Sequence, residues 1–353
     1  MTVSAPAARA LERIARICAT ASADAVSLRF AVLDEIRRVV AFDAYAWLLT
    51  DPETEVGSAP VADVPCLPEL PRLIRLKYLT AINRWTLLEG AAGVLSVSTQ
   101  GQLNRSLVWC EMLADYGVTD VASVVFRCRH GCWGFLDLWR RGDAPCFTPS
   151  DTAFLTALAK PVTDALRRCA ANTFTLTAPA MVRVGPIVLV LSPDLDVRAQ
   201  TPETSEYLRV LVPPGADQRP IPAGAYNVGA QLLAVEAGVD MHTPTARVHL
   251  SAGVWLTLRA ARIGTSGPIA DQDIAVAIDI ASATERTSLF GRACGLSARE
   301  LELLAHLITG SDTRKLAALM FVSENTIQDH LKSIFSKTGT SNRRLLLARA
   351  GGH

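Results

Sequence analysis

The sequence lacks the features that mark several large classes of protein. Its longest strongly apolar run, from Pro186 to Leu191, is far shorter than the ~20 residues that a membrane helix needs. The N-terminus, MTVSAPAARALERIARICATA, lacks the basic start and apolar block of a secretory signal and instead repeats apolar residues at helical spacing. We therefore expect a cytoplasmic protein with no membrane partner and with its eight cysteines reduced.

The signatures of common enzymes are also missing. The chain has no Gly-x-x-x-x-Gly-Lys-Ser/Thr phosphate loop, no Gly-x-Ser-x-Gly and no His-Glu-x-x-His. The paired-acid, aspartate and lysine pattern of a phosphoacceptor receiver is not evident near the N-terminus. An enzyme that uses an N-terminal cavity is an alternative without a catalytic constellation, so we expect no catalytic residue and no cofactor.

Two cysteines and a histidine lie close together, as Cys128, His130 and Cys132. A structural zinc site needs four ligands, no second pair follows at a suitable spacing, and Cys146 is the one nearby candidate. Across a tight hairpin the two thiols would face each other in a half-buried sheet. A zinc site and a reversible disulfide are alternatives, but the sequence favours buried reduced cysteines and no metal.

The chain is long, and half of its residues are hydrophobic. Its 353 residues are too many for one ordinary compact domain, so two or three are expected. Half of the residues are hydrophobic and 20% are charged, which indicates a globular chain. Residues 295–353 carry eight Lys/Arg against five Asp/Glu, a net charge of +3, whereas the whole chain carries +1. This difference favours a polyanion-binding module at the C-terminal end.

The C-terminal segment has the capping signals of short helices. Ser297 and Glu300 form a capping box, and Gly310 ends the first helix, whose apolar face is formed by Leu301, Leu304 and Ile308. A second short helix begins at Asp312 and turns Leu316, Ala317 and Met320 inward. A tight turn around 321–323 then leads to a third helix capped by Ser323.

The third predicted helix has two distinct faces. Ile327, Leu331, Ile334 and Thr338 form an apolar stripe that must pack on the earlier helices. The opposite side carries Asn325, Gln328, Asp329, Lys332 and Ser336. This pattern predicts a helix-turn-helix, whose second helix lies in a major groove of DNA. A surface helical hairpin that packs on its own protein is the alternative.

The segment LSARELELLAHLITGSDTRKLAALMFVSENTIQDHLKSIFSKTGTSNRRLLL resembles the C-terminal DNA-binding domain of the LuxR family of bacterial transcription regulators. We assign residues 290–353 to this domain. The matching positions are Glu300, Gly310, Ala317, Val322, Ser323, Thr326, Ile327, His330, Leu331, Ile334, Lys337, Gly339, Asn342 and Arg343. Because the phosphate loop is missing, the chain is not one of the large ATP-binding regulators that share this module.

The resemblance implies roles for individual residues. Thr326 matches a phosphate contact, and Gln328, Asp329 and Lys332 occupy base- or backbone-reading positions. The full set of expected DNA-binding residues is Thr313, Ser323, Asn325, Thr326, Gln328, Asp329, Lys332, Lys337 and Arg343. The last helix implies dimer contacts through Asn342, Leu345, Leu346 and Arg349.

Three positions depart from the family pattern. The family usually has a basic residue at Gln328, a neutral or basic one at Asp329, and an acidic one at Lys315. Gln can pair with adenine and Asp can accept from cytosine, so these residues would retune sequence preference. The lost positive charge also predicts weak non-specific affinity and a flatter salt dependence.

The first 290 residues predict two mixed domains after an N-terminal helix at 1–22. Residues 23–170 contain a helix, a strand AYAWLL, a hairpin of VASVVFRC with CWGFLDLWR, and a long helix capped at Thr148 with a kink at Pro161. This order resembles a GAF domain, and a generic α+β domain without a ligand is the alternative. Trp47, Trp85, Trp133 and Trp139 are either the lining of an apolar cavity or core residues.

Residues 171–177 are a predicted linker, and residues 178–285 contain strands separated by a Pro/Gly-rich loop, VPPGADQRPIPAGA. Their order resembles a PAS domain. The fold class is therefore multidomain: two α+β sensor-like domains, GAF-like and PAS-like, followed by an all-α four-helix helix-turn-helix domain.

These features predict a transcription regulator that is not an enzyme. The expected partners are double-stranded DNA, a second copy in a homodimer, an unidentified small-molecule effector and RNA polymerase. The alternative is a protein-interaction regulator whose helix-turn-helix has weak DNA affinity.

Overall fold

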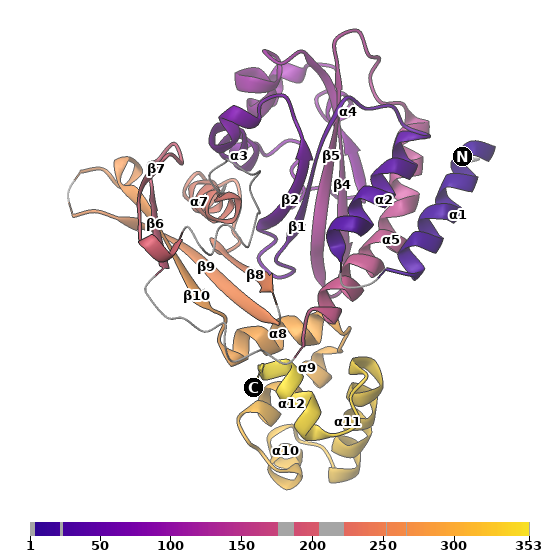
Figure 1. The fold of residues 1–353 in the computed structure, drawn as a ribbon, viewed down its shortest axis with the longest axis vertical. Helices are drawn as coiled ribbons and strands as arrows, with labels where there is room; N and C mark the ends of the chain where they lie inside the picture. Colours follow the sequence, from indigo (N-terminus) through magenta and orange to yellow (C-terminus); the bar gives the residue numbers. More distant parts are fainter. Residues whose placement is uncertain are drawn as a thin grey trace.

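The computed structural model describes residues 4–21, 24–175, 187–204, 222–251, 253–265 and 267–352. Figure 1 shows a first sheet domain at the top, a second sheet domain to its left, and a helical C-terminal domain below both. Within these ranges no helix has the length and apolar character needed to cross a membrane. The expected order of two antiparallel α+β domains followed by a helical domain is confirmed.

The first domain is a five-stranded antiparallel sheet in the order β2-β1-β5-β4-β3. Its strands are β1 (Ala44–Thr50), β2 (Gly57–Asp63), β3 (Ala92–Val94), β4 (Val118–Cys128) and β5 (Gly131–Arg141). The helices α1 (Ala5–Ala19), α2 (Ala25–Arg37) and α5 (Pro149–Asn172) pack together on one side of the sheet. The other described segments are α3 (Leu70–Leu79), α4 (Leu95–Ser98), η1 (Leu67–Glu69), η2 (Leu103–Arg105) and η3 (Trp109–Leu113).

Several sequence predictions for this domain are confirmed. The hairpin of β4 and β5 forms, and the capping box of Thr148 with Asp151 begins α5. That helix continues through Pro161 to Asn172, so the first two residues of the predicted linker are helical. The rest of that linker and the start of the PAS-like segment extend into 176–186, outside the described residues.

The second domain repeats the strand order of the first. Its strands are β6 (Ile187–Leu191), β7 (Val197–Gln200), β8 (Thr245–Ser251), β9 (Val254–Ile263) and β10 (Asp273–Ile280), with η5 (Ile269–Asp271) before β10. They are ordered β7-β6-β10-β9-β8, the same relative order as β2-β1-β5-β4-β3. The two sheets therefore share one topology, although most of the Pro/Gly-rich loop at 212–225 lies outside the described residues.

Helix α7 (Ala223–Glu236) corrects the prediction that residues 223–225 end a loop. It packs against β9 of its own domain and against α3 and β2 of the first domain (Figure 1). Even Asn227 and Gln231 in this helix are buried, so both sides of the helix contact protein. A helix that is buried all round shows no amphipathic period, which is why the sequence pattern did not reveal it.

Two buried Arg–Asp pairs join the sheet domains. Nη2 of Arg84 lies 2.7 Å from Oδ2 of Asp240, and both side chains are almost fully buried. Arg247 binds Asp51 with two bonds, Nε to Oδ2 and Nη2 to Oδ1, each 2.6 Å long. The partners come from opposite domains in each pair. Separating the domains would leave these charges unpaired, so the pairs favour one fixed arrangement of the two sheets.

The four tryptophans do not surround one cavity, which corrects that prediction. Trp47 stacks on Phe126 at 5.0 Å between ring centroids, and Trp85 stacks on Phe135 at 4.2 Å. These two indoles belong to different apolar clusters, and Trp139 belongs to a third. All four side chains are buried, so the core alternative describes them better.

The cysteines of the β4–β5 hairpin do not face each other either. The strand register places Cys132 opposite Arg127 and Cys128 opposite Gly131. Burial raises the pKa of the Cys132 thiol to about 12, and both cysteines are unpaired. In the described part of the chain, no group of three or more His, Cys, Asp or Glu side chains has a geometry suited to a metal.

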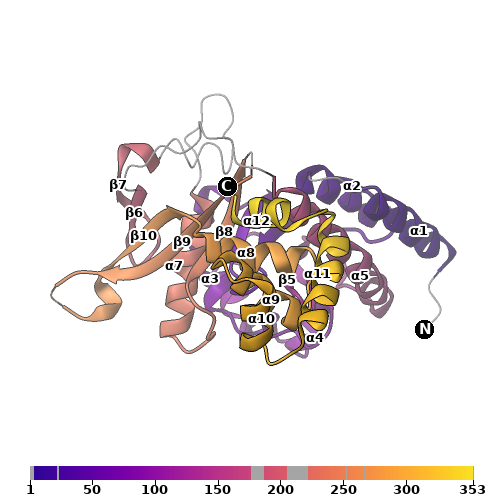
Figure 2. The ribbon, with the colours of Figure 1, turned by 90° about the horizontal axis from the view of Figure 1, so that it is seen from below.

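The C-terminal domain consists of α9 (Ala298–Ile308), α10 (Thr313–Leu319), α11 (Glu324–Thr338) and α12 (Arg343–Gly351). A further helix that the sequence analysis missed, α8 (Ala283–Ala293), joins it to the second sheet and packs against α5, α9 and α12. Figure 2, seen from below, shows α8 to α12 gathered beneath the sheet domains.

Candidate nucleic-acid interface

The predicted helix-turn-helix is formed by α10 and α11. Asp312 caps α10 by accepting the N–H of Lys315, and Ser323 caps α11 by accepting the N–H of Thr326. Between the two helices Phe321 adopts a left-handed backbone with φ of 54°, and its side chain is 95% exposed. Ser297 and Glu300 form the predicted capping box of α9. On that helix Leu303, Leu304 and Leu307 are buried, whereas the predicted Leu301 and Ile308 are only partly buried.

The two faces of α11 are those predicted from the sequence. The buried residues of this helix are Ile327, Leu331, Ile334 and Thr338. They pack toward α9 and α10, where Leu316, Ala317 and Met320 are also buried. The residues Asn325, Gln328, Asp329, Lys332 and Ser336 are all exposed. The structure therefore gathers the expected base-reading residues on one open helix face.

Ion pairing reduces the positive charge of this helix. Nζ of Lys332 lies 3.1 Å from Oδ1 of Asp329, and both side chains are more than 70% exposed. Lys337 is committed elsewhere, because its Nζ lies 2.8 Å and 2.6 Å from the two carboxylate oxygens of Glu300 on α9. The charged residues of this face are Asp329 and Lys332, so its net charge is zero, and Glu324 adds a negative charge in the first turn of α11.

Glu300 links α9 to α11. Ser333 donates to one carboxylate oxygen at 2.6 Å, and the backbone N–H of Ser297 donates to the other at 2.6 Å. Burial of this carboxyl disfavours its charged form, but the hydrogen bonds from Lys337, Ser333 and Ser297 outweigh burial and lower its pKa to about 2. Glu300 is therefore ionised at neutral pH, and Lys337 serves the internal packing of the domain.

The structure brings two other predicted DNA-binding residues together. Nη2 of Arg343, at the start of α12, donates to the hydroxyl of Thr313 at the start of α10, over 2.9 Å. Three basic residues that the sequence analysis did not select lie on the same two helices: Arg314, Lys315 and Arg344. All three are exposed, and none forms an ion pair within the described ranges. The signal that would have found them is the pairing of adjacent basic residues in Arg314-Lys315 and Arg343-Arg344.

Of the four residues expected at a dimer interface, two are exposed and two contact other parts of their own chain. Leu346 is fully buried inside the chain, and Arg349 donates to the carbonyl oxygens of Thr338 and Phe174 at 2.7 Å and 3.2 Å. These two residues therefore hold α12 against its own chain in this structure, and dimer contacts through α12 stay a prediction. Asn342 caps α12, and both Asn342 and Leu345 are exposed.

Comparisons with known proteins cover mainly this end of the chain. Residues 295–350 match the family described as bacterial regulatory proteins, luxR family. A probable transcriptional regulatory protein, SgaR of Hyphomicrobium methylovorum, is 45% identical over 53 residues, which are 15% of this chain and 25% of that protein. A probable HTH-type transcriptional regulator, GfsR of Streptomyces halstedii, is 35% identical over 72 residues, 20% of this chain and 30% of that protein.

Among solved structures, the sensor region of a sensor histidine kinase is 13% identical, with 76% of this chain and 97% of that chain aligned. The TM-score of that alignment is 0.18, so it carries no argument about the sheet domains. The aligned segments span less than a third of the two transcription regulators. What the comparisons show concerns the C-terminal segment: residues 295–350, which contain the helix-turn-helix, match the luxR family of bacterial regulatory proteins.

Proposed function

We propose that this protein is a transcription regulator that binds double-stranded DNA through α10 and α11, with α11 in the major groove. The observation that carries the proposal is the exposed polar face of α11, on a segment that matches the luxR family. The N-terminal end of α11 also suits a phosphate contact near Thr326, because the first N–H groups of a helix favour anions. Arg314 and Lys315 on α10 and Arg344 on α12 supply further exposed positive charge in the same domain.

The two sheet domains are proposed to be the sensor half, with GAF-like and PAS-like modules. Their shared strand order supports this, because modules of these two kinds are related cupped sheets. A cavity of about 90 Å³ lies in the first domain between α3 and strands β1, β2 and β5. Trp139 contributes to its lining, as does the Lys77–Asp137 ion pair, whose charged atoms are 2.7 Å apart.

Two polar atoms on the lining residues of this cavity support an effector site. Oγ of Ser106 and Oδ1 of Asn227 are buried and have no hydrogen-bond partner in the described structure. Buried polar atoms without partners are costly, and a bound molecule that offers hydrogen bonds would remove that cost. Asn227 belongs to α7 of the second domain, so a ligand there would contact both sheets.

Helix α8 is the proposed route from the sensor half to DNA. The guanidinium of Arg286 on this helix donates to three carbonyl oxygens, those of Gly253 in the second domain, Thr175 after α5, and Arg349 in α12. A ligand that changes how the sheets hold α8 would change how the helix-turn-helix is presented. In a homodimer, this sets whether two α11 helices lie one DNA turn apart.

The second candidate is a regulator that docks on another protein. It is favoured by the lack of net positive charge on the open face of α11, which weakens the attraction to DNA, and by the exposed Phe321, whose apolar ring suits a protein contact. The affinity of the full chain for a random-sequence duplex, measured between 50 and 200 mM salt, separates the two. A regulator that contacts phosphates loses affinity as salt rises, with a moderate slope because the open face of α11 has no net positive charge, whereas a docking protein shows no salt-dependent binding to DNA.

A further inference from the structure

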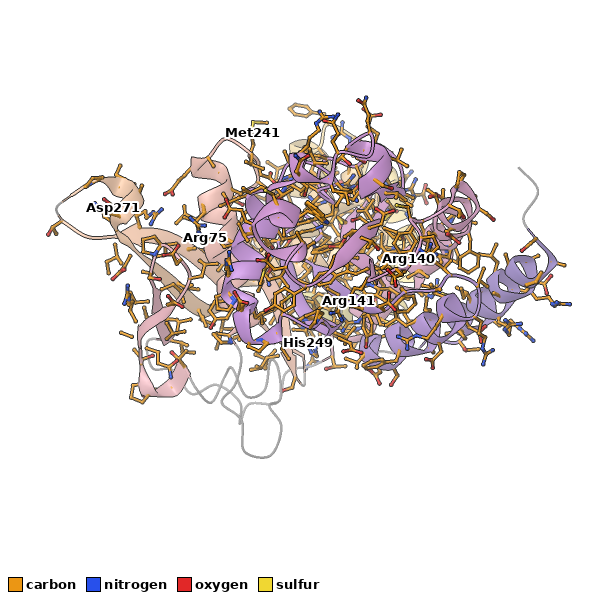
Figure 3. All side chains as sticks on the ribbon, turned by 90° about the horizontal axis from the view of Figure 1, so that it is seen from above. Arg75, Arg140, Arg141, Met241, His249 and Asp271 are labelled. Atoms are coloured by element: carbon orange, nitrogen blue, oxygen red, sulfur yellow. The ribbon has the colours of Figure 1, made fainter. Side chains whose placement is uncertain are left out.

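A second cavity, of about 280 Å³, lies where the sheet domains and α8 meet. The first domain contributes Arg29 of α2 and Trp133 of β5, and the second contributes His249 of β8 and Trp255 of β9. Leu289 of α8 completes the lining. His249, labelled in Figure 3, belongs to the strand that contacts β2 of the first domain. The site considered above as an effector cavity shares none of these residues.

Three lining residues carry ring nitrogens without a hydrogen-bond partner in the part of the chain that the structure describes. They are Nε1 of Trp133, Nε1 of Trp255 and Nε2 of His249, and each nitrogen is buried. Trp133 and Trp255 are only 4% and 8% exposed, so bulk water does not replace the missing acceptors. An indole nitrogen is a donor only. The lining therefore offers at least two unused donors to whatever fills the cavity.

Arg29 adds a buried positive charge to the same lining. Its Nε donates to the carbonyl of Ala25, and its Nη1 donates to those of Trp47 and Ala59 at 3.0 Å and 2.7 Å. Among the described residues its Nη2 finds no acceptor, and no carboxylate pairs with the guanidinium. Burial lowers the pKa of Arg29 to about 10, so this side chain keeps its charge at neutral pH.

Two other charged residues of the lining, Asp24 and Arg247, already have polar partners. Asp24 caps α2 by accepting the N–H groups of Val26 and Ser27. Arg247 is held by Asp51 and Glu53, at 2.6 Å and 3.0 Å from Nη2. Among the described residues, Arg29 is therefore the guanidinium of this lining that has no carboxylate partner, and the remaining lining is largely apolar, with Leu49, Leu166, Val248 and Leu289.

We propose that this junction cavity binds a small aromatic carboxylate, with its carboxylate held by Arg29 and by indole N–H groups and its ring against the apolar lining. A carboxylate has only acceptors, which matches unused donors and a buried cation. The cavity volume is close to the lower limit for small-molecule sites, which suits a single ring.

The site also touches the helix that leads to the helix-turn-helix. Leu289 lies on α8, which packs against α9 and α12. If the proposed DNA binding holds, ligand and DNA affinities must change each other by the same factor. The binding claim itself does not depend on DNA, so it is tested without DNA.

The test uses the full chain and benzoate as the probe, followed by ligand-observed saturation-transfer NMR. Benzamide, which has the same ring without the charge, is the comparison ligand. We expect benzoate to bind about tenfold more tightly than benzamide, because hydrogen bonds to a charged group are the stronger ones. No benzoate binding, or equal affinities for the two ligands, would overturn the proposal.

Variants locate the bound probe. Trp255→Phe removes one donor and keeps an aromatic ring, so benzoate affinity should fall about fivefold. Trp47→Phe is the matched control, because its indole nitrogen is also buried and unpartnered but Trp47 does not line the cavity. Its affinity should stay within about twofold of the parent. Arg29→Gln should abolish the preference for benzoate; if that variant does not fold, Trp133→Phe takes its place with the same fivefold loss. Equal effects of Trp47→Phe and Trp255→Phe would contradict the assignment.

Discussion

Lys332 and Asp329 form an ion pair on the open face of α11, with 3.1 Å between Nζ and Oδ1. The two residues are one turn apart on the helix, and both are exposed, so the pair stabilises the helix by only a few tenths of a kcal/mol. Its larger effect is on function, because it neutralises the one lysine that this face presents. The structure therefore explains in residue terms why a weak non-specific hold on DNA is expected.

Replacing the acid of this pair should strengthen non-specific DNA binding. Asp329→Asn removes a negative charge from the face and frees Lys332 to meet a phosphate. We expect the slope of log affinity against log salt to steepen by about one, with roughly threefold tighter binding at low salt. Fluorescence anisotropy with a random-sequence duplex measures both. The control is Glu302→Gln, since Glu302 also forms an i,i+3 ion pair, with Arg299 on α9. An equal gain in affinity from Glu302→Gln would show that the effect comes from the net charge of the protein and not from the position of Asp329.

Removing the lysine should have the opposite effect. Lys332→Ala is expected to weaken duplex binding about twofold at low salt and to flatten the salt slope only slightly, because Asp329 already offsets most of the charge of this lysine. Lys160→Ala is the matched control, because Lys160 is also exposed and paired with an aspartate on its own helix, but on α5. If the two variants bind DNA equally well, α11 does not present its open face to the duplex.

The carboxyl of Glu300 should make the stability of the helix-turn-helix depend on pH. Its pKa falls from 4.5 to about 2 on folding, so its stabilising effect is complete above pH 4.5 and is lost as pH falls toward 2. Glu300→Gln should therefore increase amide exchange in α9 and α11 at pH 7 by the equivalent of ~1–3 kcal/mol. Hydrogen-exchange mass spectrometry of the full chain measures this.

The effect of Glu300→Gln on amide exchange should itself depend on pH. At pH 3.5 the difference between Glu300→Gln and the parent should be smaller than at pH 7, because the parent has then lost part of the contribution. Glu302→Gln, two residues along the same helix, should change exchange little at either pH. A pH-independent difference would show that Glu300 acts through packing and not through its charge.

The buried Arg84–Asp240 ion pair between the sheet domains should contribute far more to stability than the exposed Arg75–Asp194 ion pair. Asp240→Ala leaves Arg84 buried without a counter-charge, and we expect a loss of ~3–5 kcal/mol of stability. The control is Asp194→Ala, since Asp194 of the second domain also pairs with an arginine of the first, Arg75 in α3 (labelled in Figure 3). The two charged groups are 3.6 Å apart, and the Asp194 side chain is 76% exposed. That change should cost less than ~1 kcal/mol.

Urea unfolding followed by tryptophan fluorescence distinguishes the two variants, because every tryptophan lies in the sheet domains or their core. Similar midpoints for Asp240→Ala and Asp194→Ala would contradict the view that buried ion pairs fix the arrangement of the two sheets.

The C-terminal helices were predictable because local signals and packing agree there. The caps Ser297, Asp312 and Ser323 each begin a helix, and Gly339 ends α11 in the left-handed conformation. Exposed and buried residues alternate with the helical period on α11, so its open face followed from the sequence.

The parts that were not predictable depend on contacts between distant segments. The burial of α7 on two domains removes its period, and the burial of Leu346 depends on α12 packing against α8 and α9. The four tryptophans look alike in the sequence, but the fold distributes them over three apolar clusters, with Trp47 and Trp133 together in one of them. The sequence suggested Lys337 as a DNA contact, because it does not reveal that Lys337 forms an ion pair with Glu300, 37 residues earlier.

The measurement that tests the central claim most directly is the selection of bound sites from random double-stranded DNA by the purified full chain. If α11 reads DNA bases, repeated selection should enrich a shared sequence, and Gln328→Ala should change the preference at one position of that sequence. Enrichment of no common sequence, or an identical preference in Gln328→Ala, Asp329→Asn and Lys332→Ala, would contradict the account.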